Sequence, residues 1–339
     1  METITDKEAC RQEAYQLGFS ECGFTDIEPS LRTEYYERWI SEGKHGGMEW
    51  MERNNDRRLR PANILKGAQS IVCLGYNYYQ EEPNRRGRIA KYALGKDYHK
   101  VLFKKLKALC RWMQTQGGDQ KPYVDTGPVL EKPIAAQSGI GWQAKNTLLL
   151  SKNAGPYLMI GTIITTLRFE PDEPIKDHCG SCHKCIDACP TGAITGPYQL
   201  DARRCLAYLS IEHKGSIPEA YRRAMGDRVF GCDECLDVCP WVRWAKTSHE
   251  AKFSPTAFPD LRDTLYWDEH TFWEHFQGTP IMRLKLRRWK RNVCVVLGNI
   301  GDEQDISALE QIASSEDEML GEHAQWAIRE IQRRHTKGD

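Results

Sequence analysis

Apolar and polar positions in the first half of the chain alternate between strand-like runs and helix-like periods. Residues 70–79 (SIVCLGYNYY) form an apolar, β-branched run that predicts a strand, and residues 157–167 (YLMIGTIITTL) predict a longer, central strand. Residues 99–113 place apolar side chains at helical spacing with lysines on the opposite face, which predicts an amphipathic helix. This alternation is typical of a layered α/β domain, which we expect over residues 1–170.

One acidic side chain lies between two shorter predicted elements. Residues 121–126 (KPYVDT) predict a strand that ends in a turn at Asp125. The next predicted helix begins near Pro128, because proline suits a first helical turn, and it ends near Gly139. Asp125 is therefore placed where an aspartate often caps a helix.

The pattern changes twice in the second half of the chain. Strand signals vanish and cysteines appear over residues 171–245, which we expect to form a separate unit. Residues 246–280 are rich in aromatic and turn residues and predict no clear element. From about residue 281, apolar positions follow a helical period in three successive segments. We therefore expect residues 246–339 to form a helical tail that resembles a HEAT-type repeat pair.

Charge and hydropathy restrict the setting of the protein. The chain has 47 basic and 47 acidic residues, so any surface that binds nucleic acid must be local. Its first residues are charged, and no run of eighteen apolar residues predicts a membrane span. We expect a cytoplasmic monomer with no membrane partner.

The chain has 13 cysteines, of which eight fall between Cys179 and Cys239 at short, regular spacings. Disulfides are rare in reducing compartments, so this clustering indicates metal or redox chemistry. The other five stand alone, and we interpret them as small buried apolar residues. They are Cys10, Cys22, Cys73, Cys110 and Cys294.

The spacing of the eight clustered cysteines is typical of two [4Fe–4S] clusters. The first run is Cys-x2-Cys-x2-Cys-x3-Cys-Pro, and the second is one cysteine shorter, with Cys205 as the natural replacement. In two-cluster ferredoxins, the last cysteine of each run serves the other cluster. This rule predicts one set of Cys179, Cys182, Cys185 and Cys239, and a second set of Cys189, Cys205, Cys232 and Cys235. Structural zinc would not explain the third cysteine of each run or the trailing prolines.

Other cofactor motifs are absent from the sequence. It contains no Gly-x-Gly-x-x-Gly after a strand and no Walker loop. Asp97 and His99 begin the Asp-x-His-x-x-Gly pattern that delivers a histidine to cobalt, but Leu102 replaces its glycine. We therefore interpret His99 as a helix-start or polar-core histidine, and expect no protein histidine on cobalt.

Several long segments, in the same order, resemble the epoxyqueuosine reductase family. They include KYALGKDYHKVL, VDTGPVLEKPIAAQSGIGWQAKNTLLLS, LDARRCLAYLSIEHKGSIPE and GDRVFGCDECLDVCPW, together with the cysteine spacing. The resemblance covers about residues 20–245, and the helical tail also fits. It implies a cobalamin-dependent enzyme that reduces epoxyqueuosine to queuosine at the wobble position of tRNA. Its partners would be that tRNA and an external low-potential electron donor.

Asp125 matches the proton donor of that family. Opening an epoxide and expelling its oxygen as water needs an acid beside that oxygen. A carboxyl group next to an apolar corrin face would have its pKa raised by desolvation. The alternative is that Asp125 only caps the helix that begins near Pro128.

The resemblance also implies a cobalamin pocket. The glycine-rich segment 139–146 matches a family segment at the cofactor, where Lys145 and Asn146 could bind corrin amides. Two further residues, His213 and Lys214, are expected near either the cofactor or tRNA. The complete set of expected cofactor contacts is Arg88, Tyr92, Asp97, Asp125, Lys145, Asn146, Leu149, His213 and Lys214.

A basic stretch of the tail is the candidate surface for tRNA. Phosphates favour a helix of this kind, although a charge run is usually only a solvated face. Its cationic residues are Lys285, Arg287, Arg288, Lys290 and Arg291.

These expectations combine into one fold class and leave two rival functions. The fold class is an α/β cobalamin-binding domain with an inserted ferredoxin-like two-[4Fe–4S] segment and a C-terminal α-helical HEAT-like domain. One rival is an electron-carrier iron–sulfur protein with no substrate of its own. The other is a reductive dehalogenase-like enzyme that acts on small molecules, since the architecture also resembles the cores of those enzymes.

Overall fold

A four-stranded sheet forms the centre of the N-terminal half in this computed structural model, which describes residues 5–336. All of its neighbouring strands are antiparallel, and the two middle strands pair over eight residues, from Ser70 opposite Thr165 to Asn77 opposite Leu158. The strands, in order across the sheet, are β1 (Glu21–Asp26), β2 (Ser70–Asn77), β7 (Leu158–Thr165) and β4 (Gln120–Tyr123).

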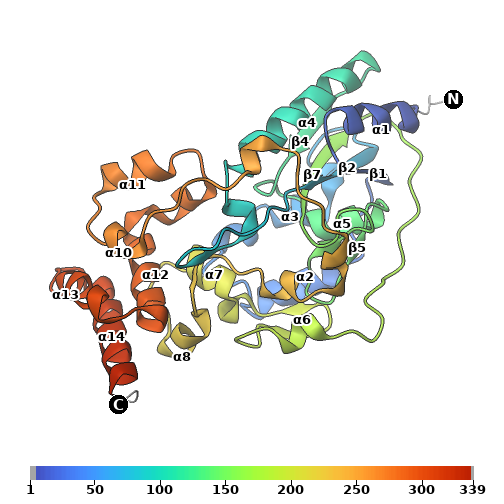
Figure 1. Cartoon of the computed structure of the whole chain (residues 1–339). Coiled ribbons are helices and arrows are strands. Elements are labelled where there is room, and N and C mark those ends of the chain that lie inside the picture. The colour runs from blue at the N-terminus through green and yellow to red at the C-terminus, as the bar shows by residue number, and fades with distance from the viewer. Residues whose placement is uncertain (1–4, 337–339) are drawn as a thin grey trace.

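Helices cover both faces of this sheet (Figure 1). Val72 and Leu74 of β2 belong to the apolar core that includes α1 (Lys7–Gln16) and α4 (Tyr98–Thr115). Ile71 and Cys73 point to the other face, where they pack with α5 (Glu131–Gln137). Burial on both faces explains why β2 reads as a continuous apolar run and not as an alternating one.

Several shorter helices and strands lie outside the four-stranded sheet. The helices α2 (Thr33–Ser41) and α3 (Asn55–Leu59) lie between β1 and β2 in the chain. Two small hairpins contribute strands β5 (Trp142–Gln143), β6 (Leu149–Leu150), β8 (Ile194–Gly196) and β9 (Gln199–Leu200).

The cysteine-rich segment is built from short helices and irregular backbone. After β7 the chain runs without a helix or strand until α6 (Lys184–Asp187), and Figure 1 shows this connection passing along one side of the molecule. The helices α7 (Leu206–Ile211), α8 (Glu219–Arg222) and α9 (Glu234–Asp237) follow. Strand β10 (Arg228–Phe230) pairs in parallel with β3 (Arg88–Ile89), which ties the segment to the N-terminal half.

The C-terminal part is helical, and Figure 1 shows it at the end of the molecule away from α1. Its helices are α10 (Leu261–Thr264), α11 (Glu269–Phe276), α12 (Lys285–Ile300), α13 (Ile306–Ala313) and α14 (Glu318–His335). The core that contains Trp289 and Trp326 continues into Leu206 and Phe230 of the cysteine-rich segment. The tail is therefore packed directly on the cysteine-rich segment.

Most of the expected elements are confirmed, with shifts at their ends. The strands at 70–79 and 157–167 are β2 and β7, and the helix at 99–113 is α4. The helix expected from Pro128 begins only at Glu131, because residues 124–130 form a turn in which Asp125 has a φ of 58°. No helix within residues 5–336 is long and apolar enough to cross a membrane.

Candidate active site and cluster sites

Several of the clustered thiols lie close enough to influence one another, while the division of all eight into two sets of ligands stays a prediction. Burial raises the pKa of Cys239, and the nearby Cys179 and Cys182 thiols add to the rise. The same causes, burial first and neighbouring thiols second, raise the pKa of Cys235, with Cys205 and Cys232 as its neighbours. Cys185 also acts on Cys235, so the two sets are adjacent.

Backbone and indole N–H groups are directed at these sulfurs. The amide of Ala193 donates to the Cys189 Sγ over 3.2 Å. The indole N–H of Trp142 is buried without a hydrogen bond of regular geometry, and it faces the Cys179 thiol, whose pKa it lowers against the effect of burial. Such donors stabilise cluster sulfurs, so the residues present fit two [4Fe–4S] clusters.

Lys145 and Asn146 brace the cysteine loops instead of lining a cofactor cavity. The Lys145 Nζ donates to the carbonyls of Gly180 and Cys182, over 2.6 and 2.9 Å. The Asn146 Nδ2 donates to the Cys235 carbonyl over 3.2 Å. In this structure the backbone of both cluster loops uses their polar ends, and their expected direct contact with a corrin stays a prediction. Leu149 is 3 % exposed and lies in the apolar core, away from any open surface.

A cavity of about 770 Å³ opens between the N-terminal half and the start of the tail. Among the expected cofactor contacts, only Asp125 lines it. Ala202 also lines it, three residues before Cys205. Burial raises the pKa of Cys205, and the charge of Lys132, a further lining residue, opposes this rise. The set that contains Cys205 is therefore the proximal set, and the set that contains Cys179 is the distal set.

The carboxylate of Asp125, which lines this cavity, faces the imidazole of His99. The Asp125 Oδ2 lies 3.2 Å from the Nε2 of His99, and the Asp97 Oδ1 lies 2.8 Å from its Nδ1. Asp97 also caps α4 by accepting from the His99 amide. The side chain of Asp125 is 59 % exposed, and it does not cap α5, whose preceding residue Leu130 has no side-chain cap. The helix-cap interpretation of Asp125 is therefore wrong.

The pKa values favour protonation of His99 and Glu131, the two neighbours of Asp125, over protonation of Asp125 itself. Burial opposes the shift, but the hydrogen bonds that His99 donates to the Asp125 and Asp97 carboxylates raise the pKa of His99 to about 9. The pKa of Asp125 is lowered, because the hydrogen bond and charge of His99 outweigh its burial. Burial, and then the charge of Asp125, raise the pKa of Glu131 to about 8. The expectation that Asp125 itself has a raised pKa is wrong, since His99 lies beside it.

Four site residues were not expected from the sequence. His99 contacts the side chain of Asp125. The backbone N–H of Asp125 donates to Glu131 Oε1 over 2.8 Å. Arg283 lines the cavity, with its Nε 2.7 Å from Glu212 Oε1. The buried Arg58 donates to the Gly127 carbonyl over 3.3 Å and so anchors the Asp125 turn. The spacing of Asp97 and His99 is the one sequence signal for this contact, but it also begins a cobalt-ligand pattern.

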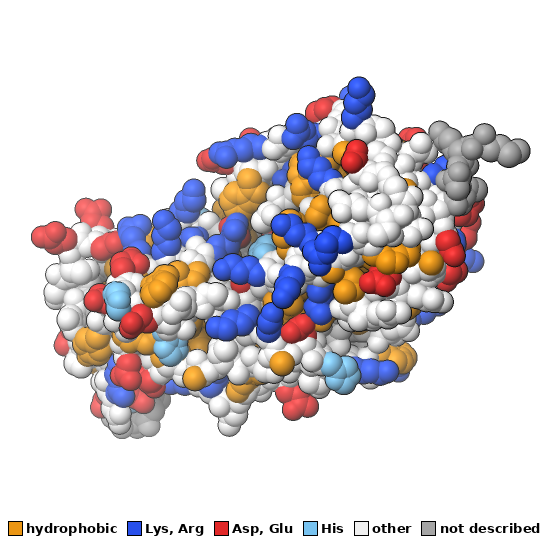
Figure 2. Space-filling model, turned by 90° about the horizontal axis from the view of Figure 1, so that it is seen from above, with side chains coloured by type: hydrophobic (Ala, Val, Ile, Leu, Met, Phe, Trp, Pro, Cys, Tyr) orange, Lys and Arg blue, Asp and Glu red, His pale blue; other side chains and the backbone are white. Residues whose placement is uncertain are grey.

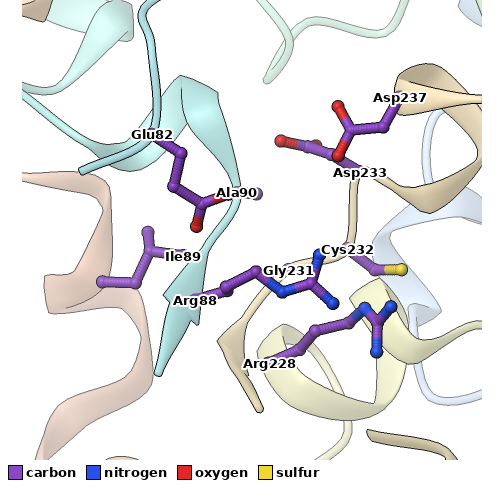
Figure 3. A pocket seen from close by; sticks show the side chains of 9 residues that line it. All are labelled: Glu82, Arg88, Ile89, Ala90, Arg228, Gly231, Cys232, Asp233 and Asp237. Carbon is purple, nitrogen blue, oxygen red and sulfur yellow. The ribbon is translucent and has the colours of Figure 1, made fainter. Parts of the chain in front are cut away.

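The remaining expected contacts lie around the proximal set. Arg88 donates to Asp227 over 2.8 Å and, as Figure 3 shows, lines a small pocket beside Cys232. Tyr92 packs against Tyr98 and Phe230. The structure puts neither residue in the lining of the large cavity.

Two further residues lie on the loop after α7. The His213 Nε2 lies 2.9 Å from the Ser216 carbonyl. Lys214 is exposed. Their expected place near a cofactor or tRNA stays a prediction.

The basic stretch of α12 is only partly available to a ligand. Arg291 is 0 % exposed, and its five N–H groups donate to the carbonyls of Leu209, His213 and Gly215 and to the Asn292 side chain. Its expected contact with phosphate is therefore wrong, because it links α12 to the loop after α7.

The other cations of this stretch differ in their availability. Arg288 donates to three backbone carbonyls, and Arg287 pairs with Asp317. Lys290 is half-buried, whereas Lys285 is exposed. The helix thus offers fewer free cations than its sequence suggests.

Comparison with known proteins places these features in one family. Residues 178–242 match the family described as "4Fe-4S double cluster binding domain", and residues 58–126 match "Epoxyqueuosine reductase QueG, DUF1730". The chain is 38 % identical to the epoxyqueuosine reductase of Xanthomonas campestris pv. campestris, covering 94 % of each chain. It is 37 % identical to the Escherichia coli epoxyqueuosine reductase, covering 96 % of this chain and 90 % of the relative.

Solved structures give the same result. A crystal structure of epoxyqueuosine reductase with an epoxyqueuosine-modified tRNA-Tyr stem loop superposes with a TM-score of 0.88 at 32 % identity, covering 96 % of this chain and 90 % of that one. The Bacillus subtilis enzyme, with its aspartate-bearing catalytic loop swung out of the active site, gives a TM-score of 0.87 at 31 % identity over 96 % and 90 % of the two chains.

Proposed function

The chain belongs to the epoxyqueuosine reductase family, and we propose that it removes the epoxide oxygen of epoxyqueuosine in tRNA to leave queuosine. The observation that carries this proposal is the arrangement of neighbouring thiols beside a large cavity that is lined by Asp125, whose carboxylate contacts His99. A pure electron carrier would have no need of that cavity or of an acid within it.

The reaction requires two electrons and two protons. Both carbon–oxygen bonds of the epoxide break, a carbon–carbon double bond forms, and the oxygen leaves as water. We propose that this cavity, which lies between an α/β domain of residues 1–170 and later segments that include Glu212 and Arg283, would hold cobalamin, whose low-valent cobalt would supply the electrons. Aromatic and apolar side chains, among them Tyr35, Trp39 and Val129, would surround it.

The residues of the chain supply the protons. Asp97 fixes the ring of His99, whose second nitrogen shares a proton with Asp125. Asp125 stands on a left-handed turn and is exposed to the cavity, so it can pass this proton to the epoxide oxygen. Glu131, whose pKa is about 8, is a second proton source behind the turn.

We propose that RNA phosphates are bound by cations around the cavity and at the start of the tail. Arg53, Lys132 and Arg283 line the cavity and are exposed. Lys285 and Arg287 follow shortly after Arg283 in the chain. Figure 2 shows Lys and Arg side chains gathered over the middle of one face, while acidic side chains are more frequent towards its two ends. Such a distribution favours a polyanion that lies across this face.

Further expectations follow from this function. Residues 171–245 would form the two-cluster unit and residues 246–339 a HEAT-like tail that contributes to RNA binding. Because the substrate is tRNA, we propose that the protein acts in the cytoplasm, and as a monomer.

The function is tested with anaerobically reconstituted protein, cobalamin, a chemical reductant and an RNA stem loop that carries epoxyqueuosine. We expect mass spectrometry of the digested RNA to show the loss of one oxygen atom from the modified nucleoside. Failure to bind a corrinoid, together with no change in the RNA, would favour the electron-carrier alternative. Turnover of free halogenated compounds without turnover of RNA would favour the dehalogenase alternative.

The pKa values of His99 and Glu131 predict a loss of activity at alkaline pH. His99 and Glu131, with pKa values of about 9 and about 8, both hold protons at neutral pH and release them above those values. We therefore expect the single-turnover rate of pre-reduced enzyme to fall as the pH rises through 8 and 9. Glu131→Gln should leave only the decline near the pKa of His99. A flat profile from neutral pH to above the pKa of His99 would contradict this assignment.

A further inference from the structure

The distal cluster set is the place where electrons enter, if the proposed function holds. Ala202, three residues before Cys205 of the proximal set, lines the cavity, whereas Cys179 and Cys239 of the distal set pack with Trp241 away from its lining. Electron transfer weakens steeply with distance, so an external donor must approach the distal set. The surface above Cys179 and Cys239 is therefore the candidate docking surface for an electron donor.

An aromatic array connects these two cysteines to the surface. Trp142 and Trp241 pack against Cys179 and Cys239, and their ring centroids are 4.7 Å apart. Trp241 stacks on Trp244, with a centroid separation of 4.5 Å. Trp142 is 2 % exposed, whereas Trp241 and Trp244 are half-buried, so the array rises from the interior to the solvent.

One cation packs on the outer end of this array, and three further cations belong to the loops of the distal set. The Arg243 guanidinium lies 3.7 Å from the Trp244 ring centroid and is exposed. Lys176, Lys184 and Lys246 are also exposed, and each lies within seven residues of a distal cysteine in the chain. Within residues 5–336, none of these four cations forms a salt bridge.

Two acidic groups of the same loops have local partners of their own. Asp177 accepts a hydrogen bond from the Tyr198 hydroxyl, and Asp187 pairs with His183. Half-exposed aromatic rings ringed by unpaired cations are typical of a surface that binds a partner transiently. We call this surface the distal face, and it consists of Lys176, Lys184, Trp241, Arg243, Trp244 and Lys246.

We propose that the distal face docks a small acidic electron-carrier protein, of the flavodoxin or ferredoxin type, which passes one electron per encounter to the distal cluster. Each encounter oxidises the carrier by one electron and reduces the cluster by one, so two encounters serve one epoxide. Complementary charge would steer the carrier and keep the complex short-lived. This proposal rests on the proposed function, because it assumes that electrons flow from the clusters to the cavity.

The test is the rate at which a reduced acidic flavodoxin reduces the clusters of the reconstituted holoenzyme, followed by stopped-flow absorbance without RNA. Lys184→Glu combined with Arg243→Glu should lower the second-order rate constant by about tenfold or more at low salt, the scale of electrostatic steering, and by little at high salt. Reduction by dithionite, which needs no docking, should be unchanged. The matched control is Lys104→Glu combined with Lys107→Glu, on the exposed side of α4, which Figure 1 places at the opposite end of the molecule from α6.

Each outcome separates the docking proposal from the enzymatic one. An equal slowing in the control variant, or no slowing in the distal-face variant, would overturn the docking site. A loss of dithionite reduction or of iron in the distal-face variant would show damage to the cluster, and Trp244→Leu would then test the same face without changing its charge. A loss of affinity for the RNA stem loop in the distal-face variant, with normal flavodoxin kinetics, would assign the face to RNA and overturn the proposal. Because cluster reduction is measured without RNA, a failure to reduce epoxyqueuosine would leave this test intact.

Discussion

Asp125→Asn should lower single-turnover reduction of epoxyqueuosine in RNA by about a hundredfold or more, the usual scale for the loss of a positioned acid. Asparagine keeps the shape of the side chain and tolerates the left-handed backbone at this position, where φ is 58°. It cannot share a proton with His99, whose Nε2 lies 3.2 Å from the Asp125 Oδ2. The assay is anaerobic rapid quench, followed by mass spectrometry of the nucleosides.

The stability of this variant should change by less than about 1 kcal/mol, since a largely exposed ion pair contributes little. Asparagine is a cleaner test than alanine, which lacks a polar group and is strained at a positive φ. Asp119→Asn is a matched control, because Asp119 is exposed at the other end of β4. Undiminished turnover in an Asp125→Asn variant with normal melting and full cofactor would remove Asp125 from the mechanism. His99 would then be the remaining donor to test.

The two-cluster unit could be predicted because its signal is local. Within each run, loops of two or three residues impose the positions of the thiols, so spacing alone indicates their geometry. Cys205 was the one ligand far from its set, and it was found by counting thiols against two complete clusters. The central strands were equally accessible, because β2 and β7 are buried on both faces and therefore read as continuous apolar runs.

The contacts in the cavity could not be predicted in this way, because they join distant segments. His99 meets Asp125 across 26 positions, and Arg283 reaches the cavity from the start of the tail. The direction of the Asp125 pKa depends on this His99 contact, and for that reason the expectation from desolvation alone failed. Arg291 shows the opposite error, since a basic helix predicts a charged surface but does not reveal which arginine the neighbouring loop buries.

Cys205→Ala should remove the proximal cluster, leave the distal one, and reduce turnover to the level without enzyme. Eight clustered thiols supply two cubanes, so iron after anaerobic reconstitution should fall from about eight to about four per chain. Cys182→Ala should leave the same amount of iron but retain the proximal cluster. The two variants should differ in electron paramagnetic resonance of the reduced protein, because each retains a cluster with different neighbours. Iron analysis and the spectra together measure the outcome.

The electron path predicts different activities for these two half-loaded proteins. Without the proximal cluster, an electron on the distal cluster has no nearby acceptor towards the cavity, which Ala202 and Lys132 border. Without the distal cluster, a protein donor that docks near Trp241 and Trp244 would be too far from the proximal one, whereas small chemical reductants that reach the cavity could still support turnover. Cys110→Ala is the control, because Cys110 is a buried thiol of α4 outside both sets. Retention of about eight irons in the Cys205→Ala variant would mean that another side chain completes the proximal site, and the assignment of Cys205 would fail.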